Sequence, residues 1–132
     1  MASDEEHTPL YEAGMKVRRK VLGDAYVDAA LARSTPLTQP LQDLVTEFGW
    51  GGIWTRPGLT LRERSLINLS MLTALNRPAE LRLHVRGALR NGCTKEEIGE
   101  VLLQTVAYCG FPAALDSFRE ANEVFESYRE EG

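Results

Sequence analysis

Helical signals run along the chain from one end to the other. Thr60 and Thr94 each stand three residues before a glutamate, and this T-x-x-E spacing is the capping box that begins many helices. Apolar residues recur at helical spacing after both boxes, whereas no segment alternates between apolar and polar residues as a half-buried strand does. The 132 residues, 43% of them hydrophobic, suffice for one core. The sequence therefore predicts a single all-α domain over residues 1–132.

Turn-forming residues mark the expected helix boundaries. After a disordered stretch at residues 1–8, a basic helix should cover residues 11–22 and end at Gly23. Asp24 should cap a short helix that reaches about Arg33. The later helices should begin at Thr38, Thr60, Pro78, Thr94 and Pro112.

The third of these helices leads into FGWGGIWTRPG at residues 48–58, which holds four glycines, two tryptophans and a phenylalanine. Glycine favours an irregular backbone, so we expect a loop with large apolar side chains. One interpretation is a loop that plugs the core, and the other is an aromatic wall or lid over a pocket. Composition favours the first, because large aromatic side chains are mostly buried.

The helix that begins at Thr60 has apolar residues on all its sides, which predicts a buried helix. In the next helix Glu80 and His84, four residues apart, share the border of an apolar stripe. An imidazole and a carboxylate would then lie side by side at the edge of a core, next to a helix that carries Glu63 in its first turn. Such a group could transfer protons. The stripe consists of Leu81, Val85, Ala88 and Leu89, and the opposite side carries Arg82, Arg86 and Arg90.

Each of these polar residues also has a purely structural interpretation. Glu63 could serve only the capping box, and Glu80 could serve only to complement the helix dipole. A lone histidine such as His84 is more often a core or interface residue with a satisfied hydrogen bond. The arginine stripe is most simply a solvated face or a subunit contact.

Composition and cysteine spacing exclude several classes of protein. A net charge of −4 argues against a nucleic-acid partner. The polar first residues and the lack of an apolar run of ~20 residues argue against a signal peptide and a membrane partner, which suggests a cytoplasmic protein. Cys93 and Cys109 are too far apart for a C-x-x-C motif. With His7 and His84 in unrelated contexts, a metal site is not expected either.

Three segments resemble the carboxymuconolactone decarboxylase family and together cover most of the chain. They are VRRKVLGDAYV at residues 17–27, the long run at residues 54–104, and YCGFPAALDSF at residues 108–118. The resemblance implies an all-helical alkylhydroperoxidase D-like fold and a homo-oligomer, a trimer or a hexamer. It also implies that 4-carboxymuconolactone is decarboxylated without a cofactor to the β-ketoadipate enol-lactone, in the protocatechuate branch of aromatic catabolism.

Peroxidase-type members of the wider superfamily use a glutamate, a C-x-x-C pair and a histidine. Glu63 and His84 match the glutamate and the histidine, whereas the cysteine positions fall on Arg77 and Glu80. This departure removes the thiol chemistry, so a peroxidase is not expected. It places a carboxylate where the redox-active sulfur would be.

The resemblance suggests roles for seven residues. His84, flanked by Glu80, would donate a proton or a hydrogen bond to the developing oxyanion, and Glu63 would orient it or relay the proton. Arg56 and Arg64 would hold the substrate carboxylates in preference to Arg82 and Arg86, which face away from His84. Trp50 and Trp54 would line the pocket and exclude water.

Two alternatives stay open at this point. One is a related enzyme of the superfamily that acts on another lactone or a keto acid. The other is a non-catalytic helical oligomer that serves as an interaction module.

Overall fold

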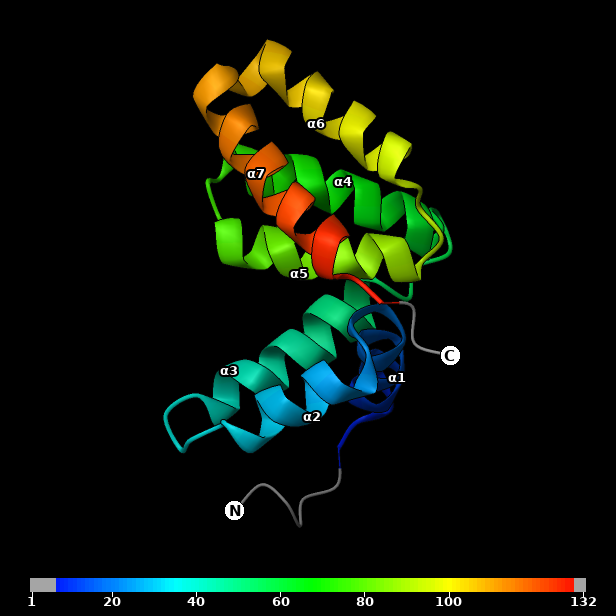
Figure 1. Ribbon diagram of the computed structural model, residues 1–132. Helices are drawn as coiled ribbons and strands as arrows, with labels where there is room; N and C mark the ends of the chain where they lie inside the picture. The colour runs from blue at the N-terminus through cyan, green and yellow to red at the C-terminus, as the bar shows by residue number, and fades with distance from the viewer. Residues whose placement is uncertain (1–6, 130–132) are drawn as a thin grey trace. The chain divides into compact units, whose positions relative to one another are not determined.

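The computed structural model describes residues 7–129, and all regular structure in that part of the chain is helical. The chain forms two compact units that divide between Leu59 and Thr60. Helices α1 to α3 and a π-helix belong to the first unit, and α4 to α7 belong to the second (Figure 1). Within residues 7–129 no helix is long and apolar enough to cross a membrane. The predicted all-α class is confirmed for this range.

In the first unit, α1 (Pro9–Leu22) is followed directly by α2 (Asp24–Ala32). Thr8 is the N-cap of α1, since its hydroxyl oxygen accepts the backbone N–H of Tyr11 at 3.0 Å. The sequence predicts disorder for residues 1–8, but Thr8 is ordered as the cap of α1. Residues 1–6 lie outside the described range. Gly23, at φ 89°, is the N-cap of α2 in place of the predicted Asp24.

The predicted loop at residues 48–58 is wrong as far as Ile53, because α3 (Gln39–Leu44) continues into the π-helix η2 (Val45–Ile53). Gly51 of η2 and Gly14 of α1 allow these two helices to pack closely. A Cβ on Gly51 would lie 2.3 Å from the carbonyl oxygen of Leu10, and one on Gly14 would lie 2.1 Å from that of Thr46. Helix α1 and η2 can therefore pack this closely only because both positions lack a side chain.

The second unit consists of α4 (Leu61–Ala74), α5 (Pro78–Arg90), α6 (Lys95–Cys109) and α7 (Phe111–Ser127). Helix α4 packs against α5 and α6, and α7 packs against the same two helices (Figure 1). Both predicted capping boxes are present, at Thr60 and Thr94. Tight turns with positive φ at Asn76, Gly92 and Gly110 connect the helices.

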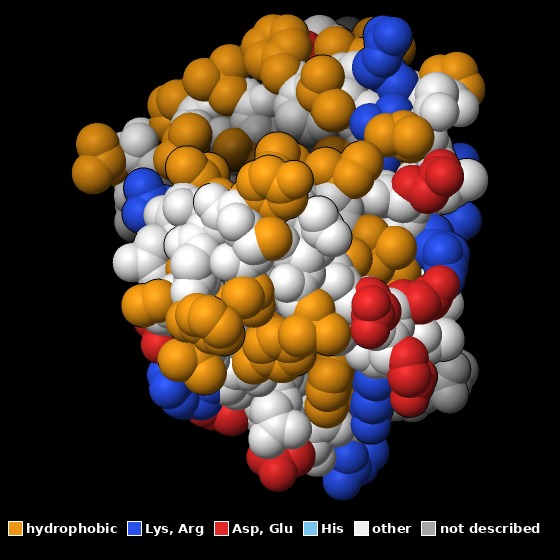
Figure 2. All heavy atoms as spheres, turned by 90° about the horizontal axis from the view of Figure 1, so that it is seen from above, with side chains coloured by type: hydrophobic (Ala, Val, Ile, Leu, Met, Phe, Trp, Pro, Cys, Tyr) orange, Lys and Arg blue, Asp and Glu red, His pale blue; other side chains and the backbone are white. Residues whose placement is uncertain are grey.

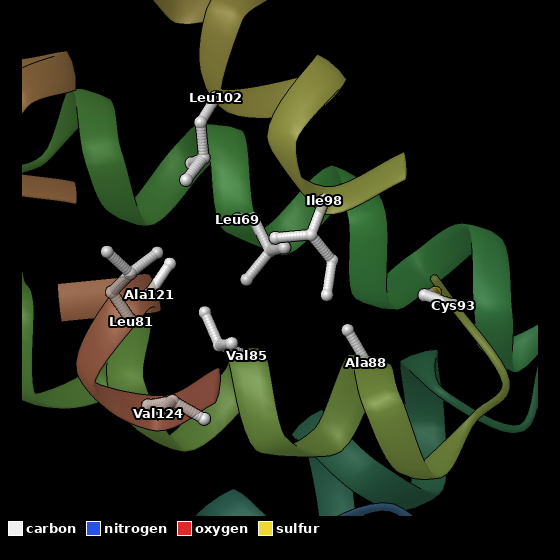
Figure 3. Packing of buried hydrophobic residues seen from close by; sticks show 9 residues of the cluster. All are labelled: Leu69, Leu81, Val85, Ala88, Cys93, Ile98, Leu102, Ala121 and Val124. Carbon is white, nitrogen blue, oxygen red and sulfur yellow. The ribbon is translucent and has the colours of Figure 1, made fainter. Parts of the chain in front are cut away.

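All four helices contribute to the core of the second unit (Figure 3). The apolar stripe of α5 is buried at Leu81, Val85 and Ala88, as predicted. Helix α4 is not buried on every side, however, because the stripe of Ile67, Met71 and Leu75 is exposed. The core residues shown in Figure 3 are Leu69, Leu81, Val85, Ala88, Cys93, Ile98, Leu102, Ala121 and Val124.

The arginines on the other side of α5 attach that helix to α7. Nη1 of Arg82 lies 2.8 Å from a carboxylate oxygen of Glu120 and 2.7 Å from one of Glu123. Nη2 of Arg86 donates to the hydroxyl oxygen of Ser127 at 3.3 Å. Arg82 and Arg86 are therefore more than a solvated face, whereas a subunit contact stays a prediction. Their partners lie some 40 positions further along the chain, beyond the reach of local sequence patterns.

Candidate active site

His84 lies on α5 next to the core residue Val85, and only 8% of its surface is exposed. Burial lowers the pKa of His84 to about 4, because the charged ring would lose its hydration. The ring is therefore neutral at pH 7. A neutral imidazole offers one N–H donor and one acceptor nitrogen, which suits it to hydrogen bonding more than to donating a proton as an imidazolium.

Asn68, which the sequence analysis missed, lies beside this ring. Its Nδ2 is 3.5 Å from Nδ1 of His84. A second contact joins α4 to the end of α5, where Nδ2 of Asn91 donates to the hydroxyl oxygen of Ser65 at 2.8 Å. The only signal in the sequence was an amide inside the apolar run LINLSML at residues 66–72.

The two predicted catalytic glutamates lie in settings different from that of the histidine. Glu80 shares α5 with His84 but is exposed. A carboxylate paired with the ring would raise the pKa of His84, and this pKa is instead lowered by burial. Glu80 is thus accessible to solvent at the start of α5, and its pairing with His84 stays a prediction.

Glu63 takes part in the capping box of α4. One carboxylate oxygen accepts from the backbone N–H of Thr60 at 2.8 Å, and the same oxygen lies 3.1 Å from its hydroxyl. These hydrogen bonds lower the pKa of Glu63, so the exposed side chain is ionised at neutral pH. Asn68 follows five residues later, about 7.5 Å further along the helix axis. On α4, Asn68 is a neighbour of the His84 ring, and an orienting role for Glu63 stays a prediction.

The predicted substrate-binding residues divide between the two units. Arg64 lies half-buried on α4 in the second unit. Arg56 lies in the first unit, exposed in the turn that follows η2. Its backbone N–H donates to the carbonyl oxygen of Ile53 at 3.0 Å.

The two tryptophans of the first unit form a stacked pair. Trp50 is buried within η2 and Trp54 is its C-cap. Their ring centroids are 4.7 Å apart, with 26° between the ring planes. Four residues make close to one turn of a π-helix, so the helix itself brings the rings together. Trp50 is 5% exposed and Trp54 is half-buried, so burial of the large aromatic side chains, as in the first interpretation, is found here, but on a helix and not on a loop.

A small hollow in the second unit lies at the turn between α4 and α5. Its lining includes Leu72, Arg77, Leu81 and Ser117 but not His84. This hollow is therefore not a substrate pocket around the imidazole. Within residues 7–129 no three His, Cys, Asp or Glu side chains gather closely enough to hold a metal ion.

Known proteins similar to this chain fall into one group. Residues 39–123 match the model of the family described as the carboxymuconolactone decarboxylase family. A nitrosuccinic acid decarboxylase, npaB, of Metarhizium robertsii is 45% identical over 87% of this chain and 80% of its own length. A 4-carboxymuconolactone decarboxylase of Acinetobacter baylyi is 40% identical over 88% of this chain and 87% of its own. An uncharacterized 15.0 kDa protein of Paracoccus denitrificans is 34% identical over 64% of this chain.

Proposed function

The chain belongs to the carboxymuconolactone decarboxylase family, and on that premise we propose that it removes CO2 from a small dicarboxylate without a cofactor. The observation that carries the proposal is that two relatives, each aligned over more than four fifths of this chain, are both decarboxylases. Their names differ in the substrate, so the type of reaction is better supported than the molecule it acts on.

The first candidate substrate is 4-carboxymuconolactone. When the bond from its ring carbon to the carboxylate breaks, CO2 leaves and the electron pair passes through the ring double bond to the lactone carbonyl oxygen. A proton then adds to carbon and gives the enol-lactone. The substrate holds its own electron sink. What a protein adds is a hydrogen-bond donor at that oxygen, a cation for the second carboxylate and a site that excludes water.

Nitrosuccinate is the second candidate, favoured by the 45% identical relative. Here the departing carboxylate lies on the carbon that carries the nitro group, so the electron pair passes to a nitro oxygen before carbon is protonated. Both candidates therefore need the same kind of help: a neutral donor at a developing oxyanion and a cation for the carboxylate that stays.

His84 is assigned the hydrogen bond to this oxyanion. Burial keeps the ring of His84 neutral at neutral pH, so the ring offers a neutral N–H at the oxyanion. The ionised Glu63 is assigned the relay of a solvent proton to carbon. Arg64, in the same unit as His84, is assigned the remaining carboxylate. Roles for Arg56, Trp50 and Trp54 in substrate binding stay predictions from the family resemblance. Glu80, exposed at the start of α5, is assigned no step.

The test is a decarboxylation assay on both substrates with no cofactor added. 4-Carboxymuconolactone is generated in situ from protocatechuate by the preceding enzymes and followed by ultraviolet absorbance, and nitrosuccinate is followed by CO2 release. Each rate is compared with the spontaneous background. Faster loss of either substrate supports the proposal and selects the substrate, whereas background rates with both would overturn it.

Variants then test the assigned residues. Loss of an oxyanion donor costs about 10²- to 10³-fold in kcat, which is the effect expected of His84→Ala. Glu63→Gln should also lower kcat, because an amide cannot relay a proton. His7→Ala is the matched control, since His7 is the chain's other histidine and is exposed. Wild-type kcat in His84→Ala would contradict the assignment.

A further inference from the structure

Asn68 is unusual for its position in α4. It follows Ile67 and precedes Leu69, a residue with 0% of its surface exposed. Asparagine is a weak helix former, and a half-buried amide needs hydrogen-bond partners to offset its lost hydration. An apolar residue would serve the stability of this helix better. Because asparagine is unfavourable at this position on both counts, its presence suggests a role beyond packing.

The neighbour of Asn68 on α5 is the ring of His84. Nδ2 of Asn68 lies 3.5 Å from Nδ1, within reach of a hydrogen bond. The bond from Asn91 to Ser65 sets the register of the two helices less than one turn of α4 away. The same Asn91 amide lies 3.4 Å from the carbonyl oxygen of Leu61, so this end of α4 is held twice. The amide of Asn91 at the end of α5 thus joins the two helices close to Asn68, through contacts that do not involve Asn68 itself.

The atom that faces the ring decides which ring nitrogen carries the proton. A neutral imidazole has one protonated nitrogen and one acceptor. An amide N–H of Asn68 that points at Nδ1 requires Nδ1 to be the acceptor, which leaves the proton on Nε2. We infer that Asn68 is a positioning residue that holds His84 in the Nε2–H form, so that this N–H is the donor for the substrate oxyanion.

The catalytic part of this inference rests on the proposed function, whereas the proton position does not. The opposite arrangement, with a proton on Nδ1, would need an acceptor atom to face the ring, which in Asn68 means Oδ1 in place of Nδ2. Asn68→Asp supplies such an acceptor with almost no change in shape, and Asn68→Leu removes the polar partner at similar volume. The two variants therefore move the proton in different ways and separate the hydrogen bond from mere packing.

The first experiment is nuclear magnetic resonance of protein labelled with ¹⁵N in its histidines, in which long-range ¹H–¹⁵N correlations identify the protonated ring nitrogen. The chain has two histidines, and His7→Gln assigns their signals. We expect a proton on Nε2 of His84 in the wild type, a mixture of both forms in Asn68→Leu, and a proton on Nδ1 in Asn68→Asp. Asn122→Leu, a change at an exposed amide on α7, should keep the wild-type pattern.

A wild-type proton on Nδ1, or the same pattern in Asn68→Leu as in the wild type, would overturn the inference. The second experiment is kinetic. Asn68→Leu should lower kcat about tenfold with little change in KM, because the donor N–H of His84 is no longer held in position. Asn122→Leu, at an exposed position on α7, should leave kcat unchanged. Unchanged kcat in Asn68→Leu would overturn the catalytic role. If the wild type decarboxylates neither substrate, the proposed function fails together with that role, and the resonance experiment still decides the proton position.

Discussion

At the scale of single residues, burial decides the chemistry of His84. The ring lies next to an amide, and burial keeps it neutral at pH 7. This favours the hydrogen-bonding role over the acid role, a choice that the sequence left open. Residue type and spacing had indicated the histidine, but the pKa depends on how deeply the ring is covered, which no local pattern contains.

The lowered pKa of His84 makes stability depend on pH. Its pKa is about 4 in the folded chain and near the ordinary 6.5 in the unfolded chain, so between these values the unfolded state binds more protons. The contribution of His84 to the free energy of unfolding is then greatest above pH 6.5 and decreases as the pH falls towards 4. At about pH 5 the loss is about 2 kcal/mol relative to neutral pH.

Urea denaturation of the wild type and His84→Gln near pH 7 and near pH 5 measures this loss. Carboxylates titrate equally in both proteins, so the difference between them isolates the histidine. The wild type should lose about 2 kcal/mol more than the variant. Equal losses would show that the ring is not buried in a neutral form.

At the scale of elements, helix starts that depend on neighbouring residues were predicted, whereas features that depend on contacts between distant residues were not. The starts of α4 and α6 were predicted at the correct residues, because the capping boxes at Thr60 and Thr94 are complete within four positions. The π-helix was not, since its glycine pattern is also typical of loops. Gly51 packs closely against Leu10 in α1, and a contact between residues 41 positions apart leaves no local pattern.

In the candidate site, too, local signals were readable from the sequence and distant contacts were not. His84 and Glu63 were proposed from spacing and family resemblance, whereas Asn68 was not considered, because one amide in an apolar run has no periodic signal. Where each carboxylate lies relative to the imidazole depends on how α4 meets α5. That register is set by contacts such as the one between Asn91 and Ser65, which are 26 positions apart.

The contact between α1 and η2 gives a prediction for glycine substitutions. Gly14→Ala should destabilise the protein by about 1–3 kcal/mol, because its new Cβ meets backbone atoms that cannot yield without moving a helix. Gly99→Ala is the matched control. Gly99 lies inside α6 with open space around it, so alanine should raise stability by about 0.5–1 kcal/mol. Far-UV circular dichroism during urea denaturation measures both, and a neutral Gly14→Ala would contradict the close approach.

At the scale of the whole molecule, apolar side chains gather at the surface (Figure 2). The exposed stripe on α4 is 42% exposed at Ile67, 48% at Met71 and 62% at Leu75. A row of this kind on one helix face is typical of a surface that another protein covers. We propose that copies of this chain cover it, in the homo-oligomer that the family resemblance implies.

Light scattering coupled to gel filtration tests the oligomer. The wild type should have a mass that is a multiple of the 14.7 kDa chain. Met71→Glu places a charge in the stripe and should shift the mass towards that of one chain, because an unpaired charge is costly to bury. Asn122→Glu, a similar change at an exposed polar position on α7, should leave the mass unchanged. An unchanged mass in Met71→Glu would exclude the stripe as the contact.

The stacked pair of tryptophans has a practical consequence. Trp50 and Trp54 are the only tryptophans of the chain, and both belong to the first unit. Their fluorescence therefore reports foremost on that unit, while His84, Asn68 and Glu63 lie in the other. Unfolding followed by emission and by circular dichroism coincides only if the two units unfold together. If they do not, an emission curve would describe the aromatic pair and overlook the helices that carry the imidazole.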